Sequence, residues 1–516
     1  MVDSGVALAA TVVVVVATAA VGIVAGRRGI ATVEDFISAR NTVERGSLTA
    51  TIVASSMGAW ILFSPAEAGA AFGGISAVVG YAVGSAVPLA VYAFLGPRIR
   101  RLIPAGHSLT EYAYVRYGPT MYAFVLVISV AYMFAFLAAE MTGIARGLQV
   151  VAGVPLWQTA LTIGLAVACY TAYGGLKASV LTDAVQTLVI LPLLAVGFGA
   201  ALLSLGGARA IHAEVVATDP TLLDPGFAGG VEFGIYVVVA ILAAEMLNQA
   251  WWQRIYAAAD SGTLRRSFLV AAVAVVPMVF LAGLFGLVAR GRGVGTDQAS
   301  EAFFVVVGDA FADPIVLAVV VLAVLLVTSS ADTLFNAIAS VVTADLPRLV
   351  AIEGRALTLA ARVLTVVVAL ASTFVAAQGY SVLAVFFVAD LLATATFVPL
   401  LAGLYSRRLT GGGALVAGVG GLLVGGALFP LTPPTLQVLP LPATFFNAFI
   451  GAATVSLALT LLAALVSGAR FDLGRLDREI ARLDDPTANA DGGRLRSDGG
   501  STATAPADGD EEGERC

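Results

Sequence analysis

Residues 47–70 read SLTATIVASSMGAWILFSPAEAGA. A helix needs about 20 predominantly apolar residues to cross a bilayer, and this stretch is long enough to do so. Small polar residues, Gly58 and Pro65 interrupt it. Such residues can break a membrane helix and free its backbone carbonyls and amides to bind ions or solutes. Small residues also let helices pack closely, so the stretch alone leaves both interpretations open.

Similar apolar stretches recur along most of the chain. Of its 516 residues, 59% are hydrophobic and 12% are charged, whereas a soluble domain has about 25% charged residues. The pattern predicts about thirteen membrane spans. They are expected at 5–26, 47–70, 75–95, 119–142, 156–173, 180–205, 231–250, 267–289, 315–343, 356–377, 382–404, 412–429 and 443–467.

The segment after the last span has a different composition. Residues 468–516 are rich in Asp, Gly, Ser, Thr and Arg and lack apolar periodicity. A short amphipathic helix is expected at 471–483, and disorder is expected beyond Asp485 because too few apolar side chains are present to form a core.

Basic residues in the loops predict the orientation. If the N-terminus is outside, the inside loops before the tail hold seventeen Lys or Arg residues, Arg254 among them, and the outside loops hold four. Short cytoplasmic loops carry an excess of basic residues. We therefore expect a multi-pass protein of the cell membrane with its N-terminus outside and its C-terminus in the cytoplasm.

Other residue types exclude several classes of protein. The two cysteines, Cys169 and Cys516, are too few for a disulfide framework. His107 and His212 lie far apart, which argues against a two-histidine metal site. The sequence has no Gly-rich phosphate loop and no segment large enough for a nucleotide-binding domain. Neither an ATP-driven pump, an enzyme nor a nucleic-acid-binding protein is expected.

Acidic side chains inside the predicted spans are candidates for function, because each costs about 2.5–3.5 kcal/mol to insert. No basic residue is expected deep in a span to pair with them, so they suit cation coordination or proton binding. Glu67 and Glu140 could instead face water at a helix end. The acidic residues in spans are Glu67, Glu140, Asp183, Glu245, Asp332 and Asp390.

The ninth span contains a cluster of hydroxyl groups around a carboxylate, Thr328-Ser329-Ser330-Ala331-Asp332-Thr333. Hard oxygen ligands are what a small alkali cation needs in place of its hydration shell. A hydroxyl can also bond back to the carbonyl four residues earlier. That explains one hydroxyl of the cluster but not all of them, so the cluster indicates a polar site.

Several strings resemble the sodium/solute symporter family, which includes proline, pantothenate, sugar, iodide and choline carriers. The first is Tyr170-Thr171-Ala172-Tyr173-Gly174-Gly175-Leu176-Lys177-Ala178, followed by Leu181-Thr182-Asp183-Ala184-Val185-Gln186. The resemblance covers about residues 30–430 in the family's order. Further strings that agree with it are 252–258, the segment from Ser329 to Asp345, and 403–408.

The resemblance implies an all-α membrane protein with a LeuT-like core of two inverted five-helix repeats, at 47–205 and 231–404. The remaining parts would be an extra N-terminal helix and a cytoplasmic loop (1–46), two C-terminal helices (412–467) and a cytoplasmic, mostly disordered tail (468–516).

The resemblance also implies a sodium site between the first helix of one repeat and the third helix of the other. At matching positions the ligands are the carbonyls of Ala54, Met57 and Leu326 and the hydroxyls of Ser329 and Ser330. Asp183 is expected near the inner end of the ion path, where its charge would draw sodium toward release. At the start of its span, Asp183 could instead cap its helix.

Substrate contacts are expected near the same helices. Some proline carriers have an aspartate where this chain has Ser56, and sugar carriers have an aromatic gate where it has Ala244. Asn248 and Gln249 could equally be solvated at the membrane edge. Asp332 matches an aspartate of the choline carriers, which hints at cationic solutes. The candidate contacts are Ser56, Gly58, Trp60, Glu245, Asn248, Gln249, Asp332 and Asp390.

The expected function is therefore sodium-coupled symport of a small organic solute by alternating access, with sodium, the solute and the bilayer as partners. A proton-coupled symporter of the same fold is the main alternative, since the buried carboxylates could titrate. A transport-module sensor is disfavoured because no kinase-sized domain follows the last span. An uncoupled facilitator would have no use for the cation-site residues.

Overall fold

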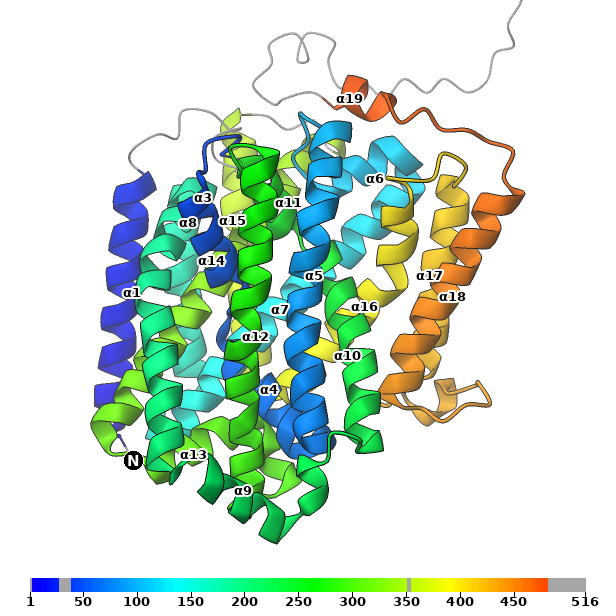
Figure 1. The fold of residues 1–516 in the computed structure, drawn as a ribbon. Coiled ribbons are helices and arrows are strands. Elements are labelled where there is room, and N and C mark those ends of the chain that lie inside the picture. Colours follow the sequence, from blue (N-terminus) through cyan, green and yellow to red (C-terminus); the bar gives the residue numbers. More distant parts are fainter. Residues whose placement is uncertain (1, 27–38, 350–353, 481–516) are drawn as a thin grey trace, which may run out of the picture.

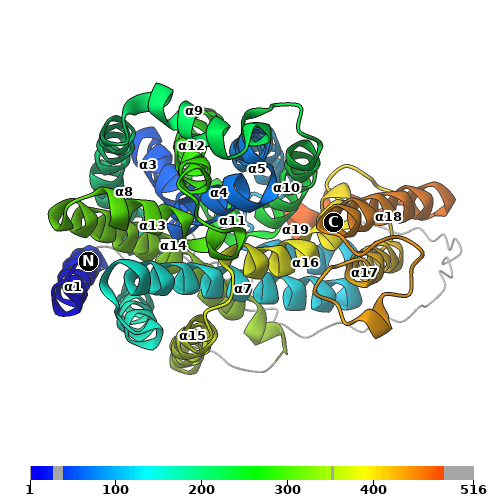
Figure 2. The same ribbon diagram turned by 90° about the horizontal axis from the view of Figure 1, so that it is seen from below.

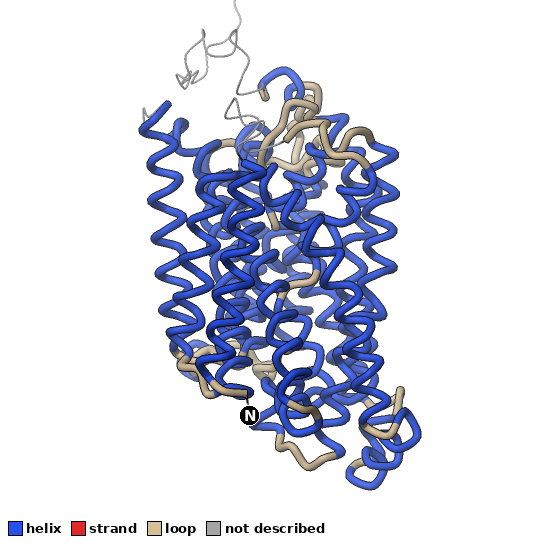
Figure 3. The backbone as a smooth tube through the Cα atoms, turned by 90° about the vertical axis from the view of Figure 1, so that its left-hand side faces the viewer, coloured by secondary structure: helices blue, strands red, loops and turns tan. Residues whose placement is uncertain are grey.

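The structure is a computed structural model that describes residues 2–26, 39–349 and 354–480. These residues form a bundle of long helices that run along a common direction and are joined by short loops at both ends (Figures 1 and 3). The N-terminus lies at one end of the bundle, and α18 (Phe445–Val466) ends at the other. A chain with this course crosses the bundle an odd number of times.

Nine helical stretches within the described residues are long and apolar enough to cross a membrane. The multi-pass, all-α prediction is confirmed, whereas the number of thirteen spans stays a prediction. One of these stretches, Ala59–Leu102, runs over several short turns and ends with α5 (Gly74–Leu102). The others lie in α1 (Ser4–Gly26), α7 (Pro119–Ala152), α8 (Leu156–Ser204), α10 (Ala228–Leu247), α12 (Ser261–Gly291), α14 (Asp313–Leu349), α16 (Val382–Ala402) and α18. Shorter apolar stretches are Leu156–Thr171, Arg362–Ala377 in α15 (Gly354–Ala377) and α17 (Gly411–Ala427).

The helix α8 accounts for two of the predicted spans. Its apolar stretches are Leu156–Thr171 and Ser179–Ser204. The chain just before α8 lies near the N-terminus, because the amide of Val2 donates to the carbonyl of Val151 (3.2 Å). The far end of α8 leads directly into α9 (Gly207–Thr218) at the same end of the bundle (Figure 1). The chain therefore reverses direction within α8 and crosses the bundle twice.

Two helices are broken in the middle of the bundle. The first break separates α3 (Arg45–Ser56) from the 3₁₀ turn η1 (Ala59–Leu62), which leads into α4 (Ser64–Glu67) and the π-helical turn η2 (Ala68–Gly73). Met57 and Gly58 between them have extended or irregular backbone angles. Of the two interpretations left open for residues 47–70, the interrupted helix is the one that the structure has. Pro65 lies in the first turn of α4, where a missing N–H costs little.

The second break separates α10 from α11 (Gln249–Ala257). Asn248 has φ −73° and ψ 109°, and its side-chain oxygen accepts the amide of Ala250 at 3.0 Å. Asn248 therefore caps α11 and is only 5% exposed. The alternative that Asn248 and Gln249 are solvated at the membrane edge is wrong, because both are buried at the break.

The helices form two groups when the bundle is seen along its axis (Figure 2). One group contains α3, α4, α5, α10 and α12, and the other contains α7, α8, α14 and α15. Within the first group, α5 and α10 approach closely because they meet at glycines. A Cβ atom on Gly80 would lie 2.3 Å from the Cα atom of Gly234, so Gly80 has no room for a side chain.

The C-terminal segment lies over the end of the bundle opposite the N-terminus (Figure 1). The expected helix at 471–483 is present in part as α19 (Arg475–Glu479). The disorder expected beyond Asp485 concerns residues outside the described ranges, as does most of the loop between α1 and α3.

Candidate functional site

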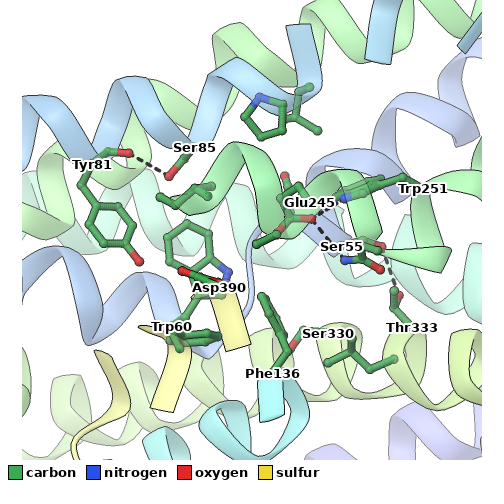
Figure 4. A pocket seen from close by; sticks show the side chains of 18 residues that line it. Ser55, Trp60, Tyr81, Ser85, Phe136, Glu245, Trp251, Ser330, Thr333 and Asp390 are labelled. Carbon is green, nitrogen blue, oxygen red and sulfur yellow. Dashed lines mark hydrogen bonds between the residues drawn. The ribbon is translucent and has the colours of Figure 1, made fainter. Parts of the chain in front are cut away.

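A cavity with about 710 Å³ of empty space, partly continuous with the outside, lies at the two helix breaks (Figure 4). Ser56 and Trp60 flank the first break, and Glu245 and Asn248 lie at the second. The remaining walls come from α5, α7, α14 and α16. The cavity therefore lies where the regular hydrogen bonding of both helices is interrupted.

The lining of the cavity combines aromatic rings, hydroxyl groups and carboxylates. Trp60 stacks on Tyr81 with ring centroids 5.8 Å apart, and Phe136 meets Phe386 edge-on at 4.8 Å. No Lys, Arg or His side chain is among the described residues that line it. The polar lining residues are Ser55, Ser56, Ser85, Glu245, Asn248, Ser330, Thr333 and Asp390.

Most of the predicted substrate contacts line this cavity, namely Ser56, Trp60, Glu245, Asn248 and Asp390. Three others lie outside its lining: Gly58, Gln249 and Asp332. Gln249 is fully buried and links α11 to the chain before α6 (Leu109–Tyr117). Its side chain donates to the carbonyl of His107 (2.8 Å) and accepts the amide of Leu109 (2.9 Å).

The aromatic lining was not predicted, apart from Trp60. Tyr81, Phe136, Trp251 and Phe386 lie in or beside apolar helices. In the sequence such residues are indistinguishable from those that face lipid or neighbouring helices. These residues belong to the cavity because of where they lie relative to the two helix breaks, and that position is known only from the fold.

Glu140 of α7 binds the first helix break directly. Its carboxylate accepts the amides of Ala59 (2.7 Å) and Trp60 (3.4 Å), which lack partners because the helix is interrupted. It also accepts the hydroxyl of Ser330 at 2.8 Å. A Cβ atom on Gly58 would lie 2.3 Å from the same carboxylate, so glycine is required here for Glu140 to reach the backbone. Glu140 is fully buried, and the expectation that it faces water is wrong.

Glu67 is also buried, at 6% exposure, and its expected contact with water is likewise wrong. It lies in α4, and one of its carboxylate oxygens accepts the hydroxyl of Ser381 at 3.0 Å. Ser381 caps the start of α16. Glu67 therefore links the first broken helix to α16.

A second buried cluster lies next to the cavity and centres on Arg254 of α11. The guanidinium of Arg254 lies 3.2 Å from the carboxylate of Asp183 in α8, and both side chains are fully buried. It also donates to the hydroxyls of Ser55 (2.5 Å) and Thr333 (3.0 Å), both of which line the cavity. The expectation that no basic residue pairs with the buried carboxylates is therefore wrong. Arg254, counted among the loop charges, is inside the bundle.

Asp183 has further partners around this ion pair. Its carboxylate accepts hydroxyls from Thr51 (2.6 Å) and Ser329 (2.6 Å). It does not cap a helix, because the bonds found for its carboxylate among the described residues all come from side chains and none from a backbone amide. The capping alternative is wrong, and Asp183 instead joins α3, α8, α11 and α14.

Asp332 faces the same side of α14 as this cluster. It accepts the hydroxyls of Ser179 (2.8 Å), Tyr170 (3.0 Å) and Thr182 (3.2 Å) and is fully buried. Arg254 interacts with it electrostatically. Asp332 thus belongs with Asp183 and Arg254 rather than with the cavity.

The residues predicted to bind sodium lie where α3 ends against α14. The hydroxyls of Ser55 and Thr333 are 3.1 Å apart, so the two helices touch at this point. Ala54 and Met57 are buried at the end of α3, and Leu326, Ser329 and Ser330 are buried in α14. Of the hydroxyl cluster, Thr328 bonds back to the carbonyl of Val324 (2.9 Å). Ser329 and Ser330 bond to carboxylates of other helices, as the cluster indicated.

Comparison with known families identifies the class of protein. The model of the sodium:solute symporter family matches residues 36–421. The chain belongs to the sodium:solute symporter family. As a member it is a transporter and not an enzyme, and the membrane-spanning helices agree with that assignment.

Curated relatives of this sodium:solute symporter differ in their solutes. The chain is 26% identical to a spermidine transporter of Candida albicans, over 61% of this chain and 60% of the relative. It is 28% identical to the sodium/pantothenate symporter of Escherichia coli, over 37% of this chain and 40% of the relative. A probable urea active transporter of Schizosaccharomyces pombe is 28% identical over 32% of this chain and 24% of the relative. The matches thus cover less than two thirds of each relative.

Solved structures show that the symporter has the LeuT-type transporter fold. A Na⁺-coupled sialic acid symporter superposes with a TM-score of 0.73 at 15% identity, over 90% of this chain and 98% of that one. A nucleobase-cation-symport-1 family transporter gives a TM-score of 0.57 at 12% identity, over 86% and 98% of the two chains. At these identities the likeness concerns the fold alone.

Proposed function

We propose that the protein carries a small organic solute by sodium-coupled symport, with alternating access to the cavity at the helix breaks. One observation supports this proposal most strongly. The hydroxyls of Ser329 and Ser330 donate to two carboxylates, and these carboxylates bind the two sides of the first helix break. Through Asp183 and Glu140, these contacts reach α3 and η1. A sodium:solute symporter of LeuT-type fold uses such a break to bind its ion.

The proposed sodium ligands are the carbonyls of Ala54, Met57 and Leu326 and the hydroxyls of Ser329 and Ser330. A hydroxyl that donates its proton to a carboxylate still has lone pairs for a cation. Asp183 and Glu140 would therefore orient the hydroxyl oxygens of the two serines toward the ion. Because Arg254 already pairs with Asp183, we propose that Asp183 supports the ion site by holding the Ser329 oxygen in place.

Replacing both Ser329 and Ser330 by alanine tests the sodium site. The apparent sodium affinity of solute uptake in proteoliposomes should fall by about tenfold or more, which corresponds to roughly 1.4 kcal/mol. Ser456→Ala is the matched control, because this hydroxyl is equally buried but bonds to Ala395 of α16, away from the break. Unchanged sodium dependence in the double variant would show that these hydroxyls are not ligands.

A proton-coupled symporter is the second candidate, and Glu140 favours it. This carboxylate is fully buried, contacts Ser330 and pairs with no basic side chain among the described residues. Uptake driven by an inward proton gradient without sodium, and lost in Glu140→Gln, would establish it. Uptake driven only by a sodium gradient would exclude it.

The proposed location is the cell membrane, with the N-terminus outside and the C-terminal segment in the cytoplasm. Single cysteines at Ala217 and Arg408, two exposed positions, would test the orientation in a background without Cys169 and Cys516. An impermeant thiol reagent added to intact cells should label only the cysteine at position 217. Labelling at position 408 alone would reverse the orientation.

A further inference from the structure

Two carboxylates line the cavity without any basic side chain to balance them. Glu245 and Asp390 are both lining residues, and the described lining contains no Lys, Arg or His. Both carboxylates belong to the wall of one cavity, one on α10 and the other on α16. Like charges repel more strongly in water-poor surroundings, because the energy between two charges rises as the dielectric constant falls. The cavity therefore has a deficit of positive charge.

Asp390 has the clearest need for an external partner. Its side chain is 5% exposed, yet no described residue donates a hydrogen bond to its carboxylate or forms an ion pair with it. A carboxylate inside a membrane bundle is costly, and such residues usually mark a functional site. The residue lies in the wall of the cavity (Figure 4), so a ligand there can supply the missing partner.

Glu245 is held in place by groups that leave its charge uncompensated. Its carboxylate accepts the indole N–H of Trp251 and the side-chain amide of Asn248 at 3.1 Å. These neutral donors fix the carboxylate at the second helix break without neutralising it. Glu245 is thus oriented, whereas Asp390 is free to adjust to a ligand.

Aromatic rings around the two carboxylates suit the rest of such a ligand. Trp60 with Tyr81, and Phe136 with Phe386, form two contacting pairs in the lining. The faces of aromatic rings attract ammonium groups and also cover the methylene groups between them. A carboxylic acid would meet two negative charges here, and a neutral solute would leave both of them unbalanced.

On this basis we infer that the solute is an organic cation with two or more ammonium groups, held between Glu245 and Asp390. The inference rests on the proposed transport function and adds the chemistry of the solute. A dication balances both carboxylates, and a linear diamine has the methylene chain that the rings can cover. It also explains why the described lining of this cavity supplies no cation of its own.

Competition for uptake into proteoliposomes tests the charge of the solute. Labelled 1,4-diaminobutane and spermidine should enter in a saturable manner, and unlabelled diamine should compete at least tenfold better than 1,4-butanediol, urea or pantothenate. Transport confined to a neutral or anionic solute would overturn the inference, yet would leave sodium-coupled symport standing. Saturable diamine uptake that does not depend on sodium would support the inference about the solute but would contradict sodium-coupled symport.

Charge-removing variants test the residues. Asp390→Asn and Glu245→Gln keep the shapes of the side chains, and each should raise the KM for the diamine at least tenfold. Glu232→Gln is the matched control, because Glu232 lies on α10 with Glu245 but is exposed. A KM unchanged in both cavity variants would contradict the assignment.

A second readout separates ligand binding from a structural role. Saturating diamine should raise the Tm of the purified wild-type protein and of Glu232→Gln, but not that of Asp390→Asn. If the diamine stabilises Asp390→Asn as much as the wild type, Asp390 does not bind it.

Discussion

Two pairs of buried carboxylates lie on either side of one wall of the cavity and differ in the source of their positive charge. Asp183 pairs with the guanidinium of Arg254, and Asp332 interacts with it electrostatically, whereas Glu245 and Asp390 have no cation among the described residues that line the cavity. Ser55 and Thr333 form the shared wall, because they line the cavity and also bind Arg254. The difference teaches that an acidic residue in a membrane helix has two possible uses. When it pairs with a basic side chain of the same protein, it holds helices together. When it has no such partner, it can bind a cation that enters from outside.

Removing Arg254 should have the largest effect on stability and uptake. In Arg254→Leu, Asp183 stays buried without its cation, and breaking one partner of a buried ion pair costs about 3–5 kcal/mol. We expect poor folding, a much lower Tm and loss of uptake. Arg265→Leu is the control, because this exposed guanidinium lies over the ring of Phe94 at the surface.

A second change in the same cluster tests whether charge is the cause. Adding Asp183→Asn to Arg254→Leu removes the uncompensated charge, so the double variant should be more stable than Arg254→Leu alone. If Asp183→Asn brings no recovery, lost packing of the arginine accounts for the damage instead.

Glu140 extends the comparison to a carboxylate that contacts the proposed ion site. Glu140→Gln keeps the side-chain volume but weakens the hold on Ser330 and on the amides of η1. The apparent sodium affinity should fall by about tenfold, or roughly 1.4 kcal/mol. The KM for the solute at saturating sodium should change less. A changed KM with normal sodium dependence would place Glu140 with the solute rather than with the ion.

Ser55→Ala should have the smallest effect. It removes the hydroxyl that bonds to Arg254, Asp183 and Thr333 and leaves the ion pair between Arg254 and Asp183 intact. The expected loss of stability is about 0.5–1.5 kcal/mol, measured by unfolding in denaturant. A loss as large as that of Arg254→Leu would show that the hydroxyl, and not the ion pair, holds the cluster.

Features encoded within a few consecutive residues were predictable from the sequence. The length of the apolar stretches predicted a multi-pass helical protein, and the small polar residues around Gly58 made a helix break one of two interpretations of that stretch. The hydroxyl cluster of α14 was recognisable because three of its members lie next to one another, at 328–330. Two of these hydroxyls do reach polar partners on other helices.

Contacts between distant residues were not predictable. Arg254 follows two tryptophans and a glutamine, so the sequence pattern places it in a loop at the end of a span. Only the second break sends α11 back into the bundle and places Arg254 beside Asp183, 71 residues away in sequence. The contact of Glu140 with Ala59 joins residues 81 apart. The roles of the buried charges therefore depend on the fold, although their presence is plain in the sequence.

Thermal unfolding of Asp390→Asn and Asp183→Asn, measured side by side on purified protein, tests the central claim most directly. Asp390→Asn removes a charge that has no internal partner, so its Tm should equal or exceed that of the wild type. Asp183→Asn leaves Arg254 buried without its carboxylate, so its Tm should fall. Opposite shifts are the predicted result. An equal fall in both variants would show that Asp390 stabilises the fold as Asp183 does, and would contradict the account.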